Sequence, residues 1–226
     1  MQQWLQQTVN GLTVGGVYAL LALGYTMVYG VLQMINFAHG DVFMLGAFGG
    51  YYVLSALDLH TSITRTASWL AIIVAMLVGA VVSAAAAVVI ERLAYRPLRR
   101  APRLAPLISA IGVSFLLENI MLRRTNAQNR NYPPIFPGGG VHVVGVQISY
   151  VRIFLIGMSF VFLALLYLLV MRTRTGRAIR AVAEDRDLAA LMGVDVDRTI
   201  VITFVIGALL AGATGVMYGF YITQIG

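Results

Sequence analysis

The stretch GLTVGGVYALLALGYTMVYGVLQMINFAHG, residues 11–40, contains thirty consecutive positions without a charged side chain if His39 is counted as neutral. As a single helix it would be about 45 Å long, whereas the hydrocarbon core of a bilayer is only about 30 Å thick. Residues 41–57 are too short to cross a membrane by themselves. The sequence therefore predicts a break near Gly30, with a second membrane helix over about residues 31–57.

The whole chain has the same apolar character. Of its 226 residues, 59% are hydrophobic and only 11% are charged, and the mean hydropathy is +0.83. Soluble domains carry about 25% charged residues, so we do not expect a water-soluble fold. We predict an all-α polytopic membrane protein in which residues 1–226 form a single transmembrane domain. About six spans are expected, over residues 9–31, 34–57, 67–90, 104–122, 150–171 and 199–222.

The distribution of arginine predicts the orientation in the membrane. All sixteen basic residues are Arg; five lie in residues 91–103 and six in residues 171–198. Two spans separate these segments, so they lie on one side, which the positive-inside rule makes cytoplasmic. The N-terminus and the loops at 58–66 and 126–149 are then external. Because topology accounts for the net charge of +7, no nucleic-acid partner is predicted.

Residue types that the sequence lacks exclude several chemistries. There is no cysteine, which rules out disulfides and thiol chemistry. The N-terminus lacks the charged region and cleavage site of a signal peptide, so the first span is expected to be retained. No second histidine or cysteine lies near His39, so no metal site is predicted. The chain stops just after a span, and we interpret it as C-terminally incomplete.

The polar run NFAHGD, residues 36–41, lies about 7–15 Å inside the second predicted span. Ionisable groups at such depth usually face a bundle interior or a water-filled path. In an unbroken helix Asn36, His39 and Gly40 would share one face and Asp41 would point elsewhere. Alternatively the helix unwinds at Gly40, and Asp41 becomes the N-cap of a new segment.

Two roles for these residues remain open. Discontinuous helices commonly form solute sites in transporters, and an amino-acid zwitterion suits this one. Asn36, His39 and free amides could hold its carboxylate, and Asp41 its ammonium group. Alternatively, the polar groups satisfy one another and stabilise the bundle. The other carboxylate within a span, Glu118, is expected to pair with Arg123 or Arg124, far from Asp41.

The loops carry further signals. In RAIRAVAEDRDLAALM, residues 177–192, the amphipathic spacing predicts a helix that turns into another near Asp185, after a break at Gly176 and before a stop at Gly193. The small residues 189–193 suit insertion into a groove on a partner protein.

The external loop contains tandem prolines and three consecutive glycines, which exclude a helix, followed by VHVVGVQIS, a candidate hairpin arm. It is either a docking surface or an irregular cap. GxxxG spacings at Gly11/Gly15, Gly46/Gly50 and Gly215/Gly219 predict close helix contacts.

Three stretches carry a family resemblance that covers essentially the whole chain. GLTVGGVYALLALGYTMVYGVLQMINFAHGDVFMLGAF (11–48) closely resembles the N-terminal signature of branched-chain amino acid ABC transporter permeases of the H type. LAPLISAIGVSFLLENI (104–120) and TGRAIRAVAEDRDLAALMGVDVDRTIVITFVIGALLAGATGVMYG (175–219) match the same family in the same order. Family members are longer, with further spans.

The resemblance implies a permease subunit of an ATP-driven importer in the cytoplasmic membrane of a bacterium or archaeon. Its partners would be ABC ATPase subunits, a second permease and an extracytoplasmic substrate-binding protein. No GxxxxGK[ST] loop is present, so ATP is expected to bind the partner subunits and no cofactor this chain. The cytoplasmic loop 172–198 would couple to the ATPases, although it lacks a clean Glu-Ala-Ala run. The implied coupling residues are Ala183, Glu184, Asp185, Leu188, Ala189 and Gly193.

Two other function classes compete with the importer. An ion-driven secondary transporter would require buried carboxylates, for which Asp41 and Glu118 are the span candidates. A non-transporting membrane scaffold would tolerate apolar replacements at Asn36, His39 and Asp41. Within the importer class, the sequence does not separate branched-chain amino acids from urea or short amides.

Overall fold

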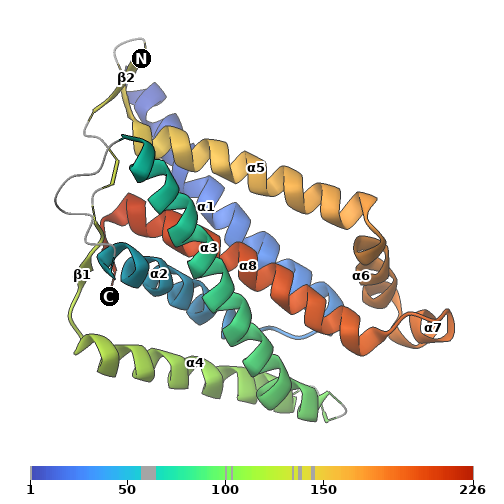
Figure 1. Ribbon diagram of the computed structural model, residues 1–226. Coiled ribbons are helices and arrows are strands. Elements are labelled where there is room, and N and C mark those ends of the chain that lie inside the picture. The colour runs from blue at the N-terminus through green and yellow to red at the C-terminus, as the bar shows by residue number, and fades with distance from the viewer. Residues whose placement is uncertain are drawn as a thin grey trace.

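A computed structural model describes residues 2–56, 65–99, 101–102, 104–133, 135–136, 139–143 and 146–225. Long helices dominate it, with both ends of the chain at one end of the bundle and two short helices at the other (Figure 1). The helices are α1 Gln2–Leu32, α2 His39–Ala56, α3 Arg65–Ile90, α4 Leu104–Thr125, α5 Tyr150–Arg172, α6 Arg174–Glu184, α7 Arg186–Leu191 and α8 Val196–Ile222. Shorter elements are the π-helical turn η1 Glu91–Tyr95, the 3-10 turn η2 Arg96–Leu98, and strands β1 Arg130–Asn131, β2 Gly140–Val143, β3 Val146–Ser149 and β4 Gln224–Ile225.

The predicted all-α membrane architecture is confirmed. Within the described residues, five helical stretches are long and apolar enough to cross a membrane: Gln2–Leu32, Trp69–Leu98, Leu104–Thr125, Tyr150–Arg172 and Val196–Ile222. The remaining predicted span corresponds to α2 together with non-helical residues before it. Helix α2 has 18 residues and packs against both α3 and α8.

The sequence predicted a break near Gly30. In the structure the break between the first two helices lies further on, at residues 33–38. Helix α1 continues to Leu32, and Gln33 adopts a positive φ of 56°. Side chains satisfy the last carbonyls of the helix, which have no partner within it. Gln33 donates to the carbonyl of Gly30 at 2.9 Å, and Arg186 donates to that of Val31. These contacts hold the last turn helical past the glycine.

Helices α2, α3 and α8 approach one another at glycines. A Cβ on Gly46 would collide with the backbone of Gly212, and one on Gly79 would lie 2.7 Å from the Gly46 carbonyl oxygen. The predicted helix contacts are confirmed at Gly46, Gly50 and Gly215, whereas Gly219 faces the Tyr132 ring of the loop before α5. The one at Gly11/Gly15 is wrong within the described residues, where a Cβ on either glycine would meet no atom within 4 Å.

The loop between α4 and α5 covers the end of the bundle opposite α6 and α7 (Figure 1). Tyr132 is 4% exposed, packs its ring against Gly219, and donates its hydroxyl to the Ala47 carbonyl at 3.2 Å. Burial raises the pKa of Tyr132, so the donor stays protonated. Strand β1 pairs with β4 after α8, and β2 pairs with β3, which confirms the predicted hairpin. The irregular cap is the interpretation that this packing favours.

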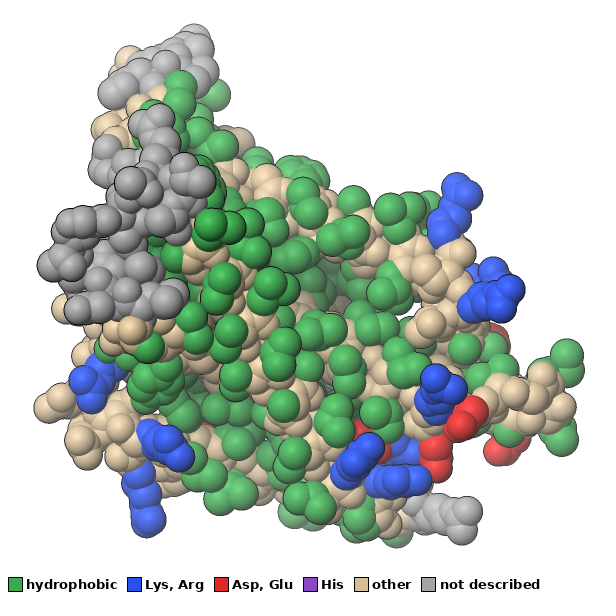
Figure 2. All heavy atoms as spheres, in the orientation of Figure 1, with side chains coloured by type: hydrophobic (Ala, Val, Ile, Leu, Met, Phe, Trp, Pro, Cys, Tyr) green, Lys and Arg blue, Asp and Glu red, His purple; other side chains and the backbone are tan. Residues whose placement is uncertain are grey.

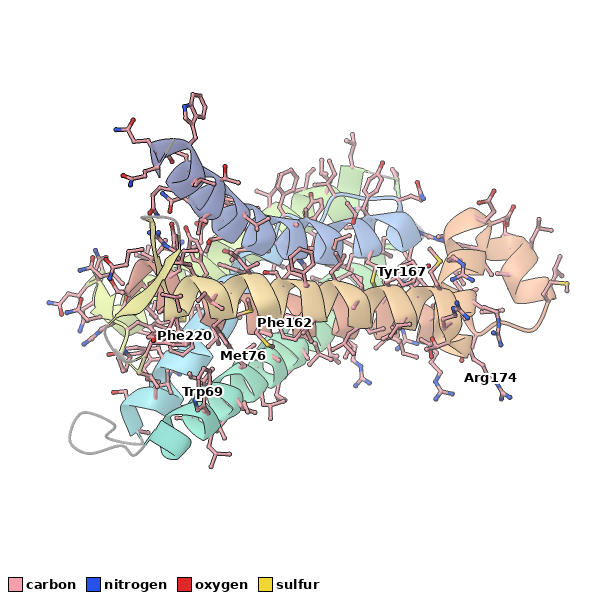
Figure 3. The ribbon with its side chains drawn as sticks, turned by 90° about the horizontal axis from the view of Figure 1, so that it is seen from above. Trp69, Met76, Phe162, Tyr167, Arg174 and Phe220 are labelled. Atoms are coloured by element: carbon pink, nitrogen blue, oxygen red, sulfur yellow. The ribbon has the colours of Figure 1, made fainter. Side chains whose placement is uncertain are left out.

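Charged side chains gather at the ends of the bundle, and hydrophobic ones cover the surface between them (Figure 2). Acidic and basic groups meet near α6 and α7, at the end that the arginine distribution makes cytoplasmic. Seen from above, α5 crosses the front of the bundle, with Tyr167 and Arg174 toward that same end (Figure 3). The apolar surface between the two charged ends is the surface expected of a bundle surrounded by lipid.

Candidate functional site

The polar run of the sequence forms the junction between α1 and α2. Helix α2 begins at His39, where the His39 N–H donates to the Asn36 carbonyl at 3.1 Å. Asp41 therefore lies inside the first turn, where its negative charge is favourable, and is not an N-cap following Gly40. The predicted discontinuity is present, but it precedes the histidine.

The side chains of this junction alternate between inside and outside. Asn36, His39 and Asp41 are 5%, 3% and 6% exposed. Ile35 and Phe37, on either side of Asn36, are 40% and 47% exposed. The unbroken helix that would place Asn36, His39 and Gly40 on one face is not observed, and Asn36, His39 and Asp41 all face the interior of the bundle. Gly40 is exposed.

Asn36 is held by a residue that the sequence analysis missed. The Tyr95 hydroxyl, in the π-helical turn after α3, donates to the Asn36 Oδ1 at 2.6 Å. Tyr95 is 1% exposed. With its oxygen engaged, Asn36 retains its amide nitrogen as the donor for another group. The only signal in the sequence was a tyrosine directly after an apolar span.

His39 occupies space that a glycine on α1 leaves free. A Cβ on Gly24 would lie 3.1 Å from the His39 Nε2 and 3.1 Å from the Gly207 carbonyl oxygen. The Tyr25 ring packs edge-on against the imidazole, with centroids 5.7 Å apart. The Nε2 atom is buried and has no hydrogen-bond partner among the described residues. A buried polar atom without a partner calls for an explanation, which a bound solute would supply.

Asp41 faces α4. Ser114 and Glu118, one turn apart on α4, are near enough to the Asp41 carboxylate to interact with it electrostatically. The expectation that the two carboxylates lie far apart is therefore wrong. Within the described part of the chain, no ion pair joins Glu118 to Arg123 or Arg124. Spacings of five and six residues do not bring helical side chains together, which explains that second error.

At the end of the bundle that holds α6 and α7, a single residue, Thr173, separates α5 from α6. Thr173 caps α6 and accepts a hydrogen bond from the Gly176 N–H at 3.0 Å. The predicted break at Gly176 is therefore wrong, since Gly176 lies in the first turn of α6. The glycine is needed there because a Cβ would collide with the carbonyl oxygens of Leu169 and Val170.

Helix α7 begins and ends as predicted. The Asp185 carboxylate accepts hydrogen bonds from the N–H groups of Asp187 and Leu188 at 2.8 and 2.9 Å. Gly193 has a φ of 83°, and its N–H donates to the Ala190 carbonyl at 3.0 Å. This left-handed residue stops the helix.

The faces of α7 differ from the prediction. Ala189 is 5% exposed and packs into the bundle with Val182 and Ile200, so it does not project into a partner's groove. Leu188 is 60% exposed, and Leu191 and Met192 are more than 80% exposed. Of the other predicted coupling residues, Glu184, Asp185 and Gly193 are exposed and Ala183 is half-buried.

Two arginines connect the short helices α6 and α7, and the start of α8, with the other membrane helices. The Arg99 guanidinium pairs with Glu91, which is fully buried, and with Asp197 in the first turn of α8. Arg186 at the start of α7 donates from Nη2 and Nε to the Val31 carbonyl at 2.6 and 3.1 Å. Burial lowers the pKa of Arg186, and the nearby Arg99 lowers it further.

Comparison with known proteins identifies the family. The family of branched-chain amino acid transport system / permease components matches residues 7–226. The chain is 43% identical over 220 residues to the high-affinity branched-chain amino acid transport system permease protein BraD of Pseudomonas aeruginosa, covering 96% of this chain and 71% of that protein. It is 43% identical over 221 residues to the corresponding LivH of Escherichia coli, covering 96% and 70%.

A more distant relative, the probable branched-chain amino acid transport permease protein LivH of Methanocaldococcus jannaschii, is 29% identical over 205 residues. The aligned region covers 87% of this chain and 60% of that protein. No solved structure matches the chain. Because the family match extends over nearly the whole sequence and the identity to two relatives reaches 43%, this chain belongs to the permease components of branched-chain amino acid transport systems.

Proposed function

We propose that this chain is the permease subunit of an ATP-driven importer that carries branched-chain amino acids across the cytoplasmic membrane. The family match over residues 7–226 carries the proposal. Separate ABC ATPase subunits would bind and hydrolyse ATP on the cytoplasmic side. A second permease subunit would complete the pathway, and an extracytoplasmic binding protein would deliver the substrate.

The junction between α1 and α2 supports contact with an amino acid in transit. The Asp41 Oδ2 is buried without a partner among the described residues and can accept from an ammonium group. The Asn36 amide nitrogen can donate to a carboxylate, because Tyr95 occupies the amide oxygen. The half-exposed Ile35 and Phe37 lie in the same junction and offer apolar surface to a branched side chain.

The cytoplasmic helix α7 suits contact with the ATPase subunits. Its exposed apolar side chains, Leu188, Leu191 and Met192, form the surface that a partner would cover. Ala183, Glu184, Asp185, Ala189 and Gly193 would shape and seat this helix, with Asp185 and Gly193 setting its two ends.

The first test is purification of the full-length protein from native membranes, with mass spectrometry of the proteins that accompany it. We expect an ABC ATPase and a second permease. In proteoliposomes containing that complex, uptake of labelled leucine should depend on ATP, and unlabelled valine and isoleucine should compete better than urea or acetamide. Uptake driven by a proton or sodium gradient without ATP would overturn the proposal in favour of a secondary transporter.

The junction is tested separately in the same proteoliposomes. Asp41→Asn and Asn36→Ala should reduce leucine uptake without loss of the assembled complex. Tyr167→Ala is the control, because Tyr167 is exposed on α5, outside the junction. Unchanged uptake by both junction variants would assign these residues to stabilisation of the bundle.

A further inference from the structure

We infer that Arg186 is the positioning residue through which α7 holds the junction between α1 and α2. Its guanidinium donates two hydrogen bonds to the Val31 carbonyl, across 155 positions of sequence. Val31 is 1% exposed and lies one residue before α1 ends at Leu32. A cytoplasmic helix and a membrane helix are thus joined at the point where the membrane helix stops.

The chemistry of this contact suits a firm connection. A carbonyl in the last helical turn has no partner within its own helix, and a positive charge at that end is favourable. The forked guanidinium reaches the Val31 oxygen with two of its nitrogens and is partly buried there. A lysine ammonium is a single point charge and would not reproduce this geometry.

The two ends of the connection are each fixed. On the cytoplasmic side, Asp185 caps α7 and the buried Ala189 seats it against the bundle, so Arg186 moves with α7. On the membrane side, the chain leaves α1 through Gln33 and reaches Asn36, which Tyr95 holds. The junction is therefore anchored at its beginning by α7 and in its middle by the end of α3.

This arrangement gives α7 a direct route to the polar junction. A displacement of α7 that stretches the contact between Arg186 and Val31 frees the first residues of the junction, while Asn36 stays bound to Tyr95. The inference rests on the proposed function, in which ATPase subunits move α7. It goes beyond it by naming the residue that transmits the motion.

The chain contains a matched control. Arg180, on α6, donates to the Val170 carbonyl near the end of α5. Arg180 and Arg186 thus share a donor type, a cytoplasmic location and a target carbonyl in the last turn of a membrane helix. Only the helix bound by Arg186 continues into the polar junction.

The experiment compares Arg186→Gln, Arg186→Lys and Arg180→Gln in the full-length complex reconstituted with its ATPase subunits and binding protein. Arg186→Gln should leave basal ATPase activity unchanged and lower leucine uptake per ATP hydrolysed by at least about fivefold, within the usual range of coupling between sites. The leucine uptake per ATP of Arg186→Lys should lie between the values for wild type and Arg186→Gln. The uptake per ATP of Arg180→Gln should equal that of wild type. Equal losses in Arg180→Gln and Arg186→Gln, or normal coupling in Arg186→Gln, would overturn the inference.

A second readout does not depend on transport. The chain has no cysteine, so Ile35→Cys provides a single thiol on the exposed side of the junction. Maleimide should label this thiol faster when Arg186→Gln is added, and at the original rate when Arg180→Gln is added. Identical rates in both would contradict the positioning role even if the complex is inactive. A third result is that Arg186→Gln speeds the labelling while the wild-type complex shows no ATP-driven uptake. That result would support the positioning role and overturn only the proposed function.

Discussion

The Tyr95 hydroxyl donates a 2.6 Å hydrogen bond to the Asn36 amide oxygen, across 59 positions of sequence. Both residues are buried, and the bond connects the π-helical turn after α3 with the non-helical residues before α2. A distance this short lies at the strong end of the range for hydroxyl donors. The position of the polar junction is therefore determined by a contact with a distant residue.

Tyr95→Phe tests that contact. The substitution leaves the Asn36 oxygen buried without a donor, which costs about 1–3 kcal/mol. Thermal unfolding of the detergent-purified protein should show a lower midpoint. Tyr167→Phe is the control, because Tyr167 is 57% exposed on α5 and should give the wild-type midpoint. Equal midpoints for the two variants would contradict the role of the bond.

Arg99 and Arg96 provide a matched pair of charge deletions. Arg99→Ala leaves the fully buried Glu91 without its partner and should destabilise the fold by about 3–5 kcal/mol. Arg96 pairs with Asp197 at 3.6 Å in an exposed position, so Arg96→Ala should cost no more than about 1 kcal/mol. Thermal unfolding distinguishes the two. Adding Glu91→Gln to Arg99→Ala should recover stability, and no recovery would rule out the unpaired charge as the cause.

Gly46→Ala should prevent the close approach of α2 and α8. The added methyl group would collide with the Gly212 backbone, which no change of side-chain rotamer relieves. Gly30→Ala is the control, because its Cβ meets nothing within 4 Å, and alanine in a helix interior is favoured over glycine by about 1 kcal/mol. The unfolding midpoint should fall for Gly46→Ala and stay constant or rise for Gly30→Ala. The opposite order would contradict the packing.

The orientation in the membrane is tested with single cysteines in this cysteine-free chain. Asn129→Cys, in the exposed part of the loop after α4, should react with a membrane-impermeant maleimide in intact cells. Met192→Cys, at the end of α7, should react only after the cells are permeabilised, although the residue is 84% exposed. The reverse pattern would invert the assignment derived from the arginines.

Local signals in the sequence predicted the parts of the fold that local interactions determine. The apolar runs located the long helices, and Asp185 and Gly193 marked the ends of α7, because each acts on backbone groups within three or four residues. The break after α1 was misplaced at Gly30. Its position depends on Arg186 and Tyr95, which are distant in sequence, so no local pattern could reveal it.

The residues of the candidate site likewise divide into those that a local pattern revealed and those that depend on distant contacts. Asn36, His39 and Asp41 were predictable because polar groups within an apolar run have to face inward or a water-filled path. Tyr95 was missed because nothing in its surroundings links it to Asn36. The face of α7 on which Ala189 lies was also misjudged. A helix of six residues is too short for its apolar spacing to indicate which side is buried.

The glycine contacts among α2, α3 and α8 restrict how the protein can change shape. Because the backbones of α2, α3 and α8 touch at Gly46, Gly79 and Gly212, we expect these three helices to move as one rigid body. Helices α4 and α5 are the least buried of the five long apolar stretches in the described residues. Alternating access would therefore be a rocking motion of these outer helices against a fixed three-helix core, with the polar junction at the edge of that core.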